Sequence, residues 1–206
     1  LVRAVKDLGE VTVVAPAGNQ SGVGTALTLR TSVKIDEAPS QVGGVKCYAV
    51  SGTPADSVVL GLEHILPSGA DAVVSGINPG FNTSRNVFIS GTMGAAIQAA
   101  AKGVKACAFS MDVEGDFDDP IVKGVIGAIT TELLSQKTQR GALFNVNIPT
   151  FGETPIEGVE GAAPAPSEFK SLVQAQSDGG YEILSGLAVN IDSLELVSGT
   201  DIEVLS

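Results

Sequence analysis

The tripeptide Ser90-Gly91-Thr92, placed just before an apolar stretch, combines residue types that can bind a phosphate group. Gly91 would let a ligand approach the backbone closely, and the free N–H groups and dipole of a helix start favour an anion. The hydroxyl groups of Ser90 and Thr92 can donate hydrogen bonds as well. On its own, the same tripeptide is more typical of a plain helix N-cap. Asn78 and Asn82, which lie in a polar loop a few residues earlier, shift the balance toward an anion site.

The pattern of apolar residues predicts alternating strands and helices that would position this site. Strands are predicted over residues 11–15, 28–36, 45–50, 71–76, 105–110 and 143–149, and helices over residues 1–8, 53–66, 93–102 and 120–137. This alternation is typical of an α/β, Rossmann-like fold with a mostly parallel, doubly wound sheet. Ligands of such sheets collect outside the carboxyl ends of the strands. We therefore expect Ser21, Asn78 and Asn82 to lie on one rim of the sheet.

Two domains are predicted, a core over residues 1–150 and a β-rich C-terminal extension over residues 151–206, where Pro, Gly and Ser become frequent. Short strands are predicted in the extension at residues 182–184 and 195–197, and residues 201–206 follow an alternating, strand-like pattern. The core begins with a helical pattern, whereas an α/β layer usually begins with a strand. We therefore expect a first strand ahead of Leu1 and truncation at both ends of the chain.

Composition excludes several classes of protein. The chain has 206 residues, 44% of them hydrophobic and 17% charged, which argues against disorder and coiled coil. No apolar run approaches the ~18 residues that span a bilayer, so no membrane role is expected. The net charge of -11 and the 4% aromatic content disfavour a nucleic-acid polymer as partner. With no sign of a secretory signal, we expect a cytoplasmic protein.

Other candidate motifs favour structural interpretations. Cys47 and Cys107 lie in strand-like runs and are predicted to be buried free thiols, and the single His64 is predicted to be structural or solvated. Asp118-Asp119-Pro120 could offer a carboxylate pair to a metal, but its place before a helix favours capping. Thr53-Pro54 is likewise a helix start, with Asp56 in the first turn. The sequence contains no Walker A motif, no complete dinucleotide fingerprint and no Gly-x-Ser-x-Gly motif.

Several short blocks together resemble the SurE survival-protein family of nucleotidases. They are Val13-Val14-Ala15-Pro16, Asn19-Gln20-Ser21-Gly22, Leu27-Thr28-Leu29, Gly52-Thr53-Pro54-Ala55-Asp56, Val74 to Asn82, Ser90-Gly91-Thr92 and Asn145-Val146-Asn147-Ile148-Pro149. The blocks keep the order and similar spacing of the family, and Gly199-Thr200-Asp201 resembles a late family motif. Thr83-Ser84 stands where the family usually has Leu-Gly, and Ile89 replaces a frequent Tyr, so the loop and substrate preference are expected to differ.

The resemblance implies a metal-dependent phosphohydrolase that removes phosphate from nucleoside monophosphates, at the 5′ or 3′ position, by attack of a metal-activated water. It implies one divalent cation, Mg or Mn, held by Ser21, Asn78 and an Asp-Asp pair that is expected upstream of Leu1. Asn82 would be catalytic and would bind the substrate phosphate together with Ser90, Gly91 and Thr92. The family forms homodimers or homotetramers, with the C-terminal extension helping assembly. Without the Asp pair, the chain as given is expected to be weakly active or inactive.

Two other functions stay open at this point. A non-catalytic module that binds a nucleotide or phosphate would use the same anion site without a metal. A structural α/β domain whose polar loops are only turns would leave Ser21, Asn78 and Ser90 more than ~15 Å apart, too far for one small site.

Overall fold

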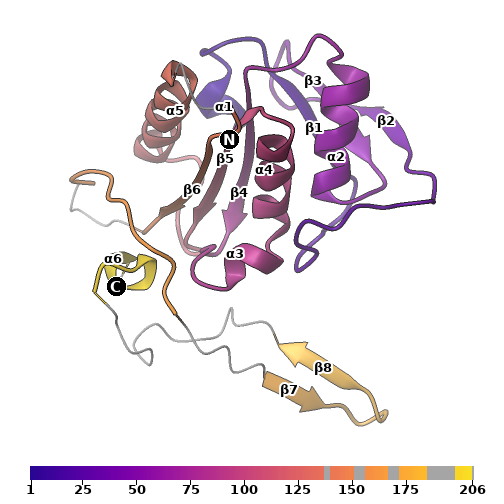
Figure 1. Cartoon of the computed structure of the whole chain (residues 1–206), viewed down its shortest axis with the longest axis vertical. Helices are drawn as coiled ribbons and strands as arrows, with labels where there is room; N and C mark the ends of the chain where they lie inside the picture. The colour runs from indigo at the N-terminus through magenta and orange to yellow at the C-terminus, as the bar shows by residue number, and fades with distance from the viewer. Residues whose placement is uncertain (137–139, 151–155, 167–171, 185–197, 206) are drawn as a thin grey trace.

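The fold is an α/β arrangement in which helices pack against two short sheets (Figure 1). We describe a computed structural model, in which residues 1–136, 140–150, 156–166, 172–184 and 198–205 are described. The strands are β1 (Thr12–Pro16), β2 (Ile35–Ala38), β3 (Lys46–Val50), β4 (Ala72–Pro79), β5 (Lys105–Met111), β6 (Leu143–Ile148), β7 (Leu172–Ala175) and β8 (Tyr181–Leu184). The helices are α1 (Val2–Val5), α2 (Pro54–Leu60), α3 (Asn86–Ile89), α4 (Gly91–Ala101), α5 (Pro120–Ser135) and α6 (Asp201–Leu205).

The strands pair mostly in parallel, as the alternation of strands and helices predicts. β4, β5 and β6 form one parallel sheet in the order β4-β5-β6. β1 is parallel to β3, and β2 adds an antiparallel edge on the other side of β3. The α/β, Rossmann-like fold class is therefore confirmed, with the described strands of the core divided into two three-stranded sheets.

The strand predicted over residues 28–36 is wrong for most of its length, because strand pairing begins only at Ile35. The backbone N–H of Thr28 donates instead to the Asp56 carboxylate at the start of α2, at 2.9 Å. Arg30 then has a φ of 64°, a left-handed conformation that an extended strand does not contain. The side chain that redirects this segment is thus 28 residues away along the chain.

β5 is the central strand and divides the core into two hydrophobic clusters. Cys107, Phe109 and Met111 face one side, where they pack with α5 residues such as Ile126 and with Val5 of α1. Ala106 and Ala108 face the other side and meet the small residues of α4. Because these side chains are so short, the α4 backbone can lie close to the sheet.

The start of α2 follows the predicted chemistry. Thr53 is the N-cap, with its hydroxyl accepting a hydrogen bond from the Asp56 N–H at 3.0 Å, and Pro54 occupies the first turn. The helix continues as one π-helical turn, η1 (Gly61–Ile65), which ends one residue before the predicted end at Leu66. His64 lies exposed in this turn, as expected. Both cysteines are free; Cys107 is buried as predicted, whereas Cys47 is only half-buried.

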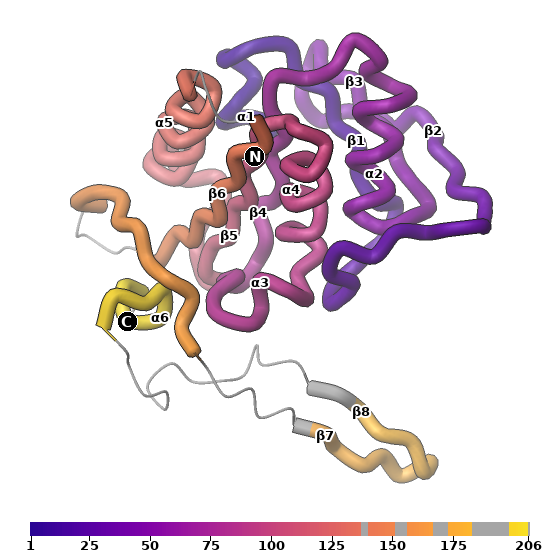
Figure 2. Tube along the Cα trace, viewed as in Figure 1, coloured from indigo at the N-terminus to yellow at the C-terminus, as the bar shows by residue number. Residues whose placement is uncertain are grey.

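The C-terminal segment differs partly from the expected β-rich extension. Figure 2 shows β7 and β8 as a hairpin that extends away from the body, which confirms the strand predicted at residues 182–184. The strand predicted at residues 195–197 lies outside the described residues. The strand-like pattern at residues 201–206 is misleading, because residues 201–205 form α6. Asp201 and Glu203 in its first turn favour a helix there through the helix dipole.

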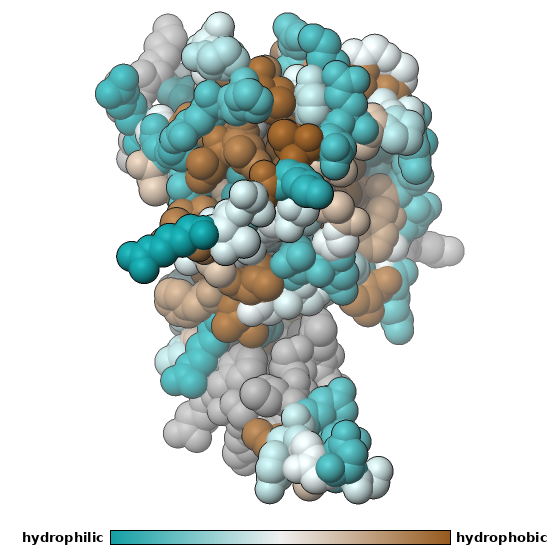
Figure 3. All heavy atoms as spheres, turned by 90° about the vertical axis from the view of Figure 1, so that its right-hand side faces the viewer, coloured by the Kyte–Doolittle hydropathy of each residue, from teal (hydrophilic) through white to brown (hydrophobic). Residues whose placement is uncertain are grey.

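The face of the molecule that carries β2 and α2 is not covered by one continuous apolar patch (Figure 3). In Figure 3, which looks at the side of β2 and α2, apolar and hydrophilic side chains are interspersed. Among the described helices, none has the length and apolar character to cross a membrane.

Candidate functional site

The N-terminus of α4 brings together three of the predicted site residues, Asn78, Ser90 and Thr92. Ser90 is the N-cap of α4, and its hydroxyl oxygen accepts a hydrogen bond from the Met93 N–H at 3.2 Å. Thr92 donates its hydroxyl to the side-chain oxygen of Asn78, at 3.4 Å. Asn78 also donates to the Gly80 carbonyl at 2.7 Å, so its amide orientation is set by the loop after β4. The structure therefore joins Asn78, one of the two residues predicted to bind the metal, to Thr92, which is predicted to bind phosphate.

The loop that contains Ser21 packs against the same helix end. A Cβ atom at Gly91 would lie 3.0 Å from the Gln20 carbonyl oxygen, and a Cβ atom at Gly94 would lie only 2.0 Å from the Gly24 carbonyl oxygen. Gly24 also donates its N–H to the Ile89 carbonyl at 2.8 Å. Glycines at these two helix positions are thus what allows the loop to dock. Ser21 itself is exposed and donates its hydroxyl to Asn19 at 2.8 Å.

Asn82 is placed differently from the other candidates, because it is buried and hydrogen-bonded to the neighbouring strands β5 and β6. It is 4% exposed, and its side-chain N–H donates to the Ser110 hydroxyl at 2.7 Å. Its backbone N–H donates to the Asn147 side chain at 2.8 Å. Its carbonyl accepts from Asn145 at 2.7 Å and from Asn147 at 3.3 Å. These bonds fix the loop between β4 and α3 on top of the parallel sheet.

A polar row across the sheet lies beneath this loop. Asn78 of β4 is in register with Ser110 of β5, and Ser110 is in register with Asn147 of β6. Sequence reasoning assigned no site role to Ser110, Asn145 or Asn147. The signal that could have found them was the Asn-x-Asn alternation in an otherwise apolar strand, which places two amides on the same face.

Asp118 and Asp119, the carboxylate pair considered for a metal, have structural partners. Asp119 caps α5 by accepting from the Ile121 N–H at 2.6 Å, which confirms the capping interpretation. Asp118 pairs with Arg3 at 2.9 Å, and this hydrogen-bonded ion pair lowers the pKa of the Asp118 carboxyl. No group of three His, Cys, Asp or Glu side chains is arranged to hold a metal among the described residues.

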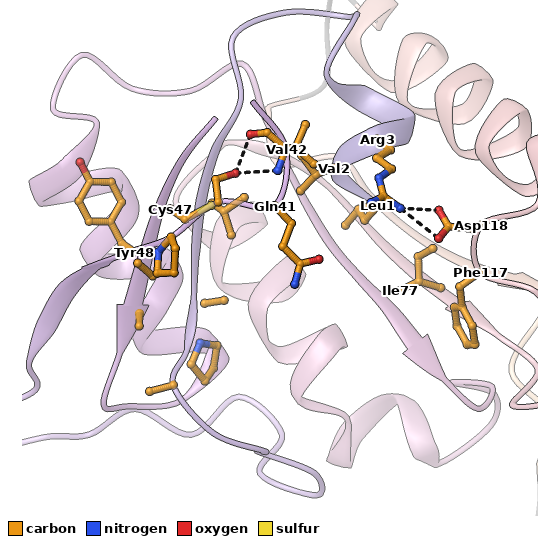
Figure 4. A pocket seen from close by; sticks show the side chains of 18 of the residues that line it. Leu1, Val2, Arg3, Gln41, Val42, Cys47, Tyr48, Ile77, Phe117 and Asp118 are labelled. Carbon is orange, nitrogen blue, oxygen red and sulfur yellow. Dashed lines mark hydrogen bonds and ion pairs between the residues drawn. The ribbon is translucent and has the colours of Figure 1, made fainter. Parts of the chain in front are cut away.

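A sizeable cavity lies elsewhere in the molecule. It measures about 910 Å³ and opens between β1 and β3 on one side and Ile77 of β4 with Phe117 on the other (Figure 4). Arg3 and Asp118 stand at its edge. None of the predicted site residues lines it, so its size does not identify the site. The cavity lies between the two sheets: β1 belongs to the sheet with β3 and β2, and Ile77 belongs to the sheet of β4, β5 and β6.

The family model described as Survival protein SurE matches residues 1–171, which is more than four-fifths of the chain. The chain belongs to the SurE family. The resemblance read from the short blocks is thereby confirmed. The crystal structure of the SurE protein from Aquifex aeolicus is similar, with a TM-score of 0.75 and 29% identity, covering 98% of this chain and 81% of that one.

Relatives of this SurE chain include proteins named 5′-nucleotidase SurE from three bacteria. The protein from Cytophaga hutchinsonii is 41% identical over 78% of this chain, and that from Flavobacterium johnsoniae is 35% identical over 95%. The protein from Thermoanaerobacter pseudethanolicus is 33% identical over 98% of this chain. The aligned part spans 62% of the Cytophaga protein, 77% of the Flavobacterium protein and 79% of the Thermoanaerobacter protein.

Proposed function

We propose that this SurE protein is a phosphoric monoester hydrolase that removes phosphate from nucleoside monophosphates. The relatives named 5′-nucleotidase support the reaction class. The observation that carries the proposal is the meeting of Asn78, Thr92 and the Ser21 loop at the N-terminus of α4. Free helix N–H groups and a hydroxyl donor at one point suit a phosphate. Whether the 5′ or the 3′ ester is preferred is part of the proposal to be tested.

The oxygen ligands that Ser21 and Asn78 can offer suit a hard divalent cation, Mg or Mn. Ser21 offers a hydroxyl oxygen and Asn78 an amide oxygen, and both metals prefer such ligands. Two neutral oxygens are a weak site without carboxylates, and no acidic cluster exists among the described residues. We propose that Ser21 and Asn78 hold the cation together with the Asp-Asp pair expected ahead of Leu1. When bound, such a cation polarises a phosphoryl oxygen and makes a bound water more acidic.

The gap between the two sheets supports the expected additional strand. Its cavity has β1 on one side and Ile77 of β4 on the other. The segment that follows β1 and the end of β4 itself both reach the start of α4, through Gln20 and Asn78 respectively. A strand between β1 and β4 that ends at the same rim would therefore deliver its last side chains beside Asn78.

The chain's own residues would bind and orient the phosphate. We propose that the N–H groups at the start of α4 donate to its oxygens, with Ser90 and Gly91 shaping the turn. The Thr92 hydroxyl donates to Asn78 in this structure and would turn its single O–H toward the bound phosphate. Such donors stabilise the charge that spreads over the equatorial oxygens during phosphoryl transfer. Asn82 is proposed to contribute as well. Its side-chain NH₂ group donates one N–H to Ser110 and has a second N–H that can donate to the phosphate.

An assay of the complete protein tests the proposal. Nucleoside monophosphates should be hydrolysed with Mn or Mg, and a chelator should abolish turnover. Turnover that ignores the chelator, or no turnover with either metal, would refute a metal-dependent nucleotidase.

A second candidate function is a phosphate- or nucleotide-binding module without catalysis. The described residues contain no acidic cluster, and a module of this kind needs none, because the helix N-terminus alone attracts the anion. It predicts saturable binding of a nucleoside monophosphate without phosphate release and without a metal requirement. Reading the residues ahead of Leu1 separates the two functions, because a strand ending in Asp-Asp supports the enzyme.

We also propose that the protein assembles into a homodimer or homotetramer through residues 151–206. The β7–β8 hairpin exposes Val173 and Tyr181 at 57% and 74%, an apolar and aromatic surface suited to a second copy. Light scattering of the chain with and without the hairpin tests this, and a monomer in both cases would contradict it.

A further inference from the structure

The helix at the end of the chain reaches back to the loop that carries Asn82. One carboxylate oxygen of Asp201 accepts a hydrogen bond from the Ser84 N–H at 2.8 Å, across 117 positions of sequence. The other oxygen accepts from the Ala165 N–H at 2.9 Å. A single side chain thus connects two backbone segments that are distant from it in sequence.

The segments around Asp201 hold one another in place. The Ala163 N–H donates to the Gly199 carbonyl at 3.0 Å, and the Asp201 N–H donates to the Ala163 carbonyl at 2.8 Å. The Ser84 hydroxyl donates to the Ala165 carbonyl at 2.8 Å. Ser84 is 6% exposed, so its bonds to Asp201 and Ala165 are shielded from solvent, whereas Ala163 and Gly199 are exposed.

Ser84 also has an unusual backbone conformation that needs support. Its φ is 50°, in the left-handed region that residues other than glycine seldom occupy. The loop must hold this conformation to turn from Asn82 into α3. The loop is also anchored earlier, at Gly80, which donates to the Met111 carbonyl at 2.7 Å, and at Asn82 itself.

We propose that Asp201 is a positioning residue of the phosphate site, which fixes the loop of Asn82 through Ser84 and makes the site depend on the C-terminal segment. This inference rests on the proposed function of that site. A carboxylate suits the task because it only accepts hydrogen bonds and does so with two oxygens. Bonds from backbone N–H groups to a charged acceptor are also stronger than neutral ones.

The experiment compares Asp201→Ala, Asp201→Asn and Asp201→Glu with Glu203→Gln in the complete protein. Glu203→Gln is the matched control, because it removes the same charge from the same helix and leaves the Ser84 and Ala165 bonds in place. Glu203 accepts a hydrogen bond from the Gly199 N–H at 2.6 Å, and the amide oxygen of Gln can still accept it. Backbone hydrogen exchange is measured for peptides over residues 80–90, residues 160–166 and β5. KM for a nucleoside monophosphate and Kd for inorganic phosphate are measured on the same samples.

Asp201→Ala should speed exchange over residues 80–90 and 160–166 by about tenfold or more, while β5 keeps its protection. KM and the Kd for phosphate should rise by about tenfold with a smaller change in kcat, because a displaced loop weakens binding of the phosphate in ground and transition states alike. Asp201→Asn should behave similarly, since its NH₂ group would face one N–H donor. Asp201→Glu should restore part of the protection and of the affinity.

Unchanged exchange over residues 80–90 in Asp201→Ala would overturn the inference, whatever the activity. The same change in Glu203→Gln would also overturn it, because charge rather than the two hydrogen bonds would then be responsible. Faster exchange with unaltered KM and Kd would show that the loop is fixed but does not position phosphate, which also contradicts the inference. The exchange data do not depend on turnover, so a failure of the proposed nucleotidase activity remains distinguishable.

Discussion

Asp56 offers a quantitative test of how the loop before α2 is held. Its side chain is 6% exposed and accepts three hydrogen bonds, from the Thr28 N–H at 2.9 Å, the Thr28 hydroxyl at 2.6 Å and the Thr53 N–H at 2.8 Å. In Asp56→Asn, the remaining oxygen can keep one N–H donor, and the Thr28 hydroxyl can turn to accept from the new NH₂ group. The Thr53 N–H cannot turn, so one bond to a charged acceptor is lost. The free energy of unfolding at neutral pH should fall by about 2 kcal/mol.

The pH dependence adds a sharper criterion. Burial raises the pKa of the Asp56 carboxyl, but the hydrogen bonds from Thr28 and Thr53 outweigh burial and hold the pKa below its ordinary value of 3.8. A carboxyl with a lowered pKa stabilises the folded state above its ordinary pKa, and this contribution is lost as the pH falls through the lowered value. The deficit of Asp56→Asn should therefore be full at neutral pH and shrink below pH 3.8.

Urea unfolding, followed at a series of pH values, measures both effects. Glu37→Gln is the matched control, since Glu37 is an exposed carboxylate on β2 and its removal should change stability by less than ~0.5 kcal/mol. The reasoning fails if the Asp56→Asn deficit is the same at every pH, or if Glu37→Gln reproduces it.

Three further predictions concern the site and the core. Asn78→Ala should lower turnover of the complete protein by more than about a hundredfold through loss of the proposed metal ligand, with less than ~1 kcal/mol change in unfolding free energy; normal kcat/KM would remove Asn78 from the site. Gly94→Ala should destabilise by about 1–3 kcal/mol, since its Cβ would meet the Gly24 carbonyl, whereas Gly124→Ala in α5, with open space around it, should be neutral or stabilising by thermal melting; equal melting temperatures for the two variants would contradict the steric argument. Cys107 is 0% exposed and burial raises its pKa to about 12, so a thiol reagent should label Cys47 alone in the native protein and both cysteines after unfolding; rapid labelling of Cys107 in the native state would disprove its burial.

Elements whose signal lies within their own residues, such as a continuous apolar run or a helix cap, were predictable from the sequence. β5 was expected over residues 105–110 and spans Lys105–Met111, because its continuous apolar run is buried on both faces. The start of α2 followed from Thr53, Pro54 and Asp56, whose capping chemistry acts within one turn. The same holds for Ser90 as the N-cap of α4.

Elements that depend on distant partners were not predictable. Residues 28–34 have an alternating pattern, but Asp56 takes the Thr28 N–H out of any strand. Residues 201–205 also alternate, yet Asp201 binds backbone groups at Ser84 and Ala165, and the segment becomes a helix. Periodicity reports which side of an element is apolar and carries no information on such contacts.

The candidate site divides in the same way. The approach of Asn78 to Thr92 is consistent with the rule that the carboxyl ends of parallel strands share one rim of the sheet, since Asn78 lies near the end of β4. The burial of Asn82 did not follow, because its partners Ser110, Asn145 and Asn147 come from two other strands, 28 to 65 positions away. Its part in phosphate binding stays a prediction.

The contact between α4 and β5 has a consequence for how the N-terminus of α4 behaves. Ala96 and Ala99 of the helix and Ala106 and Ala108 of the strand are each 0% exposed. Alanine has no rotamers, so ordering this contact costs no side-chain conformational entropy, and no side chain in it can switch to another packing. The backbone N–H groups at the helix start are therefore held in place, so the anion proposed to bind there would require little movement of the helix backbone.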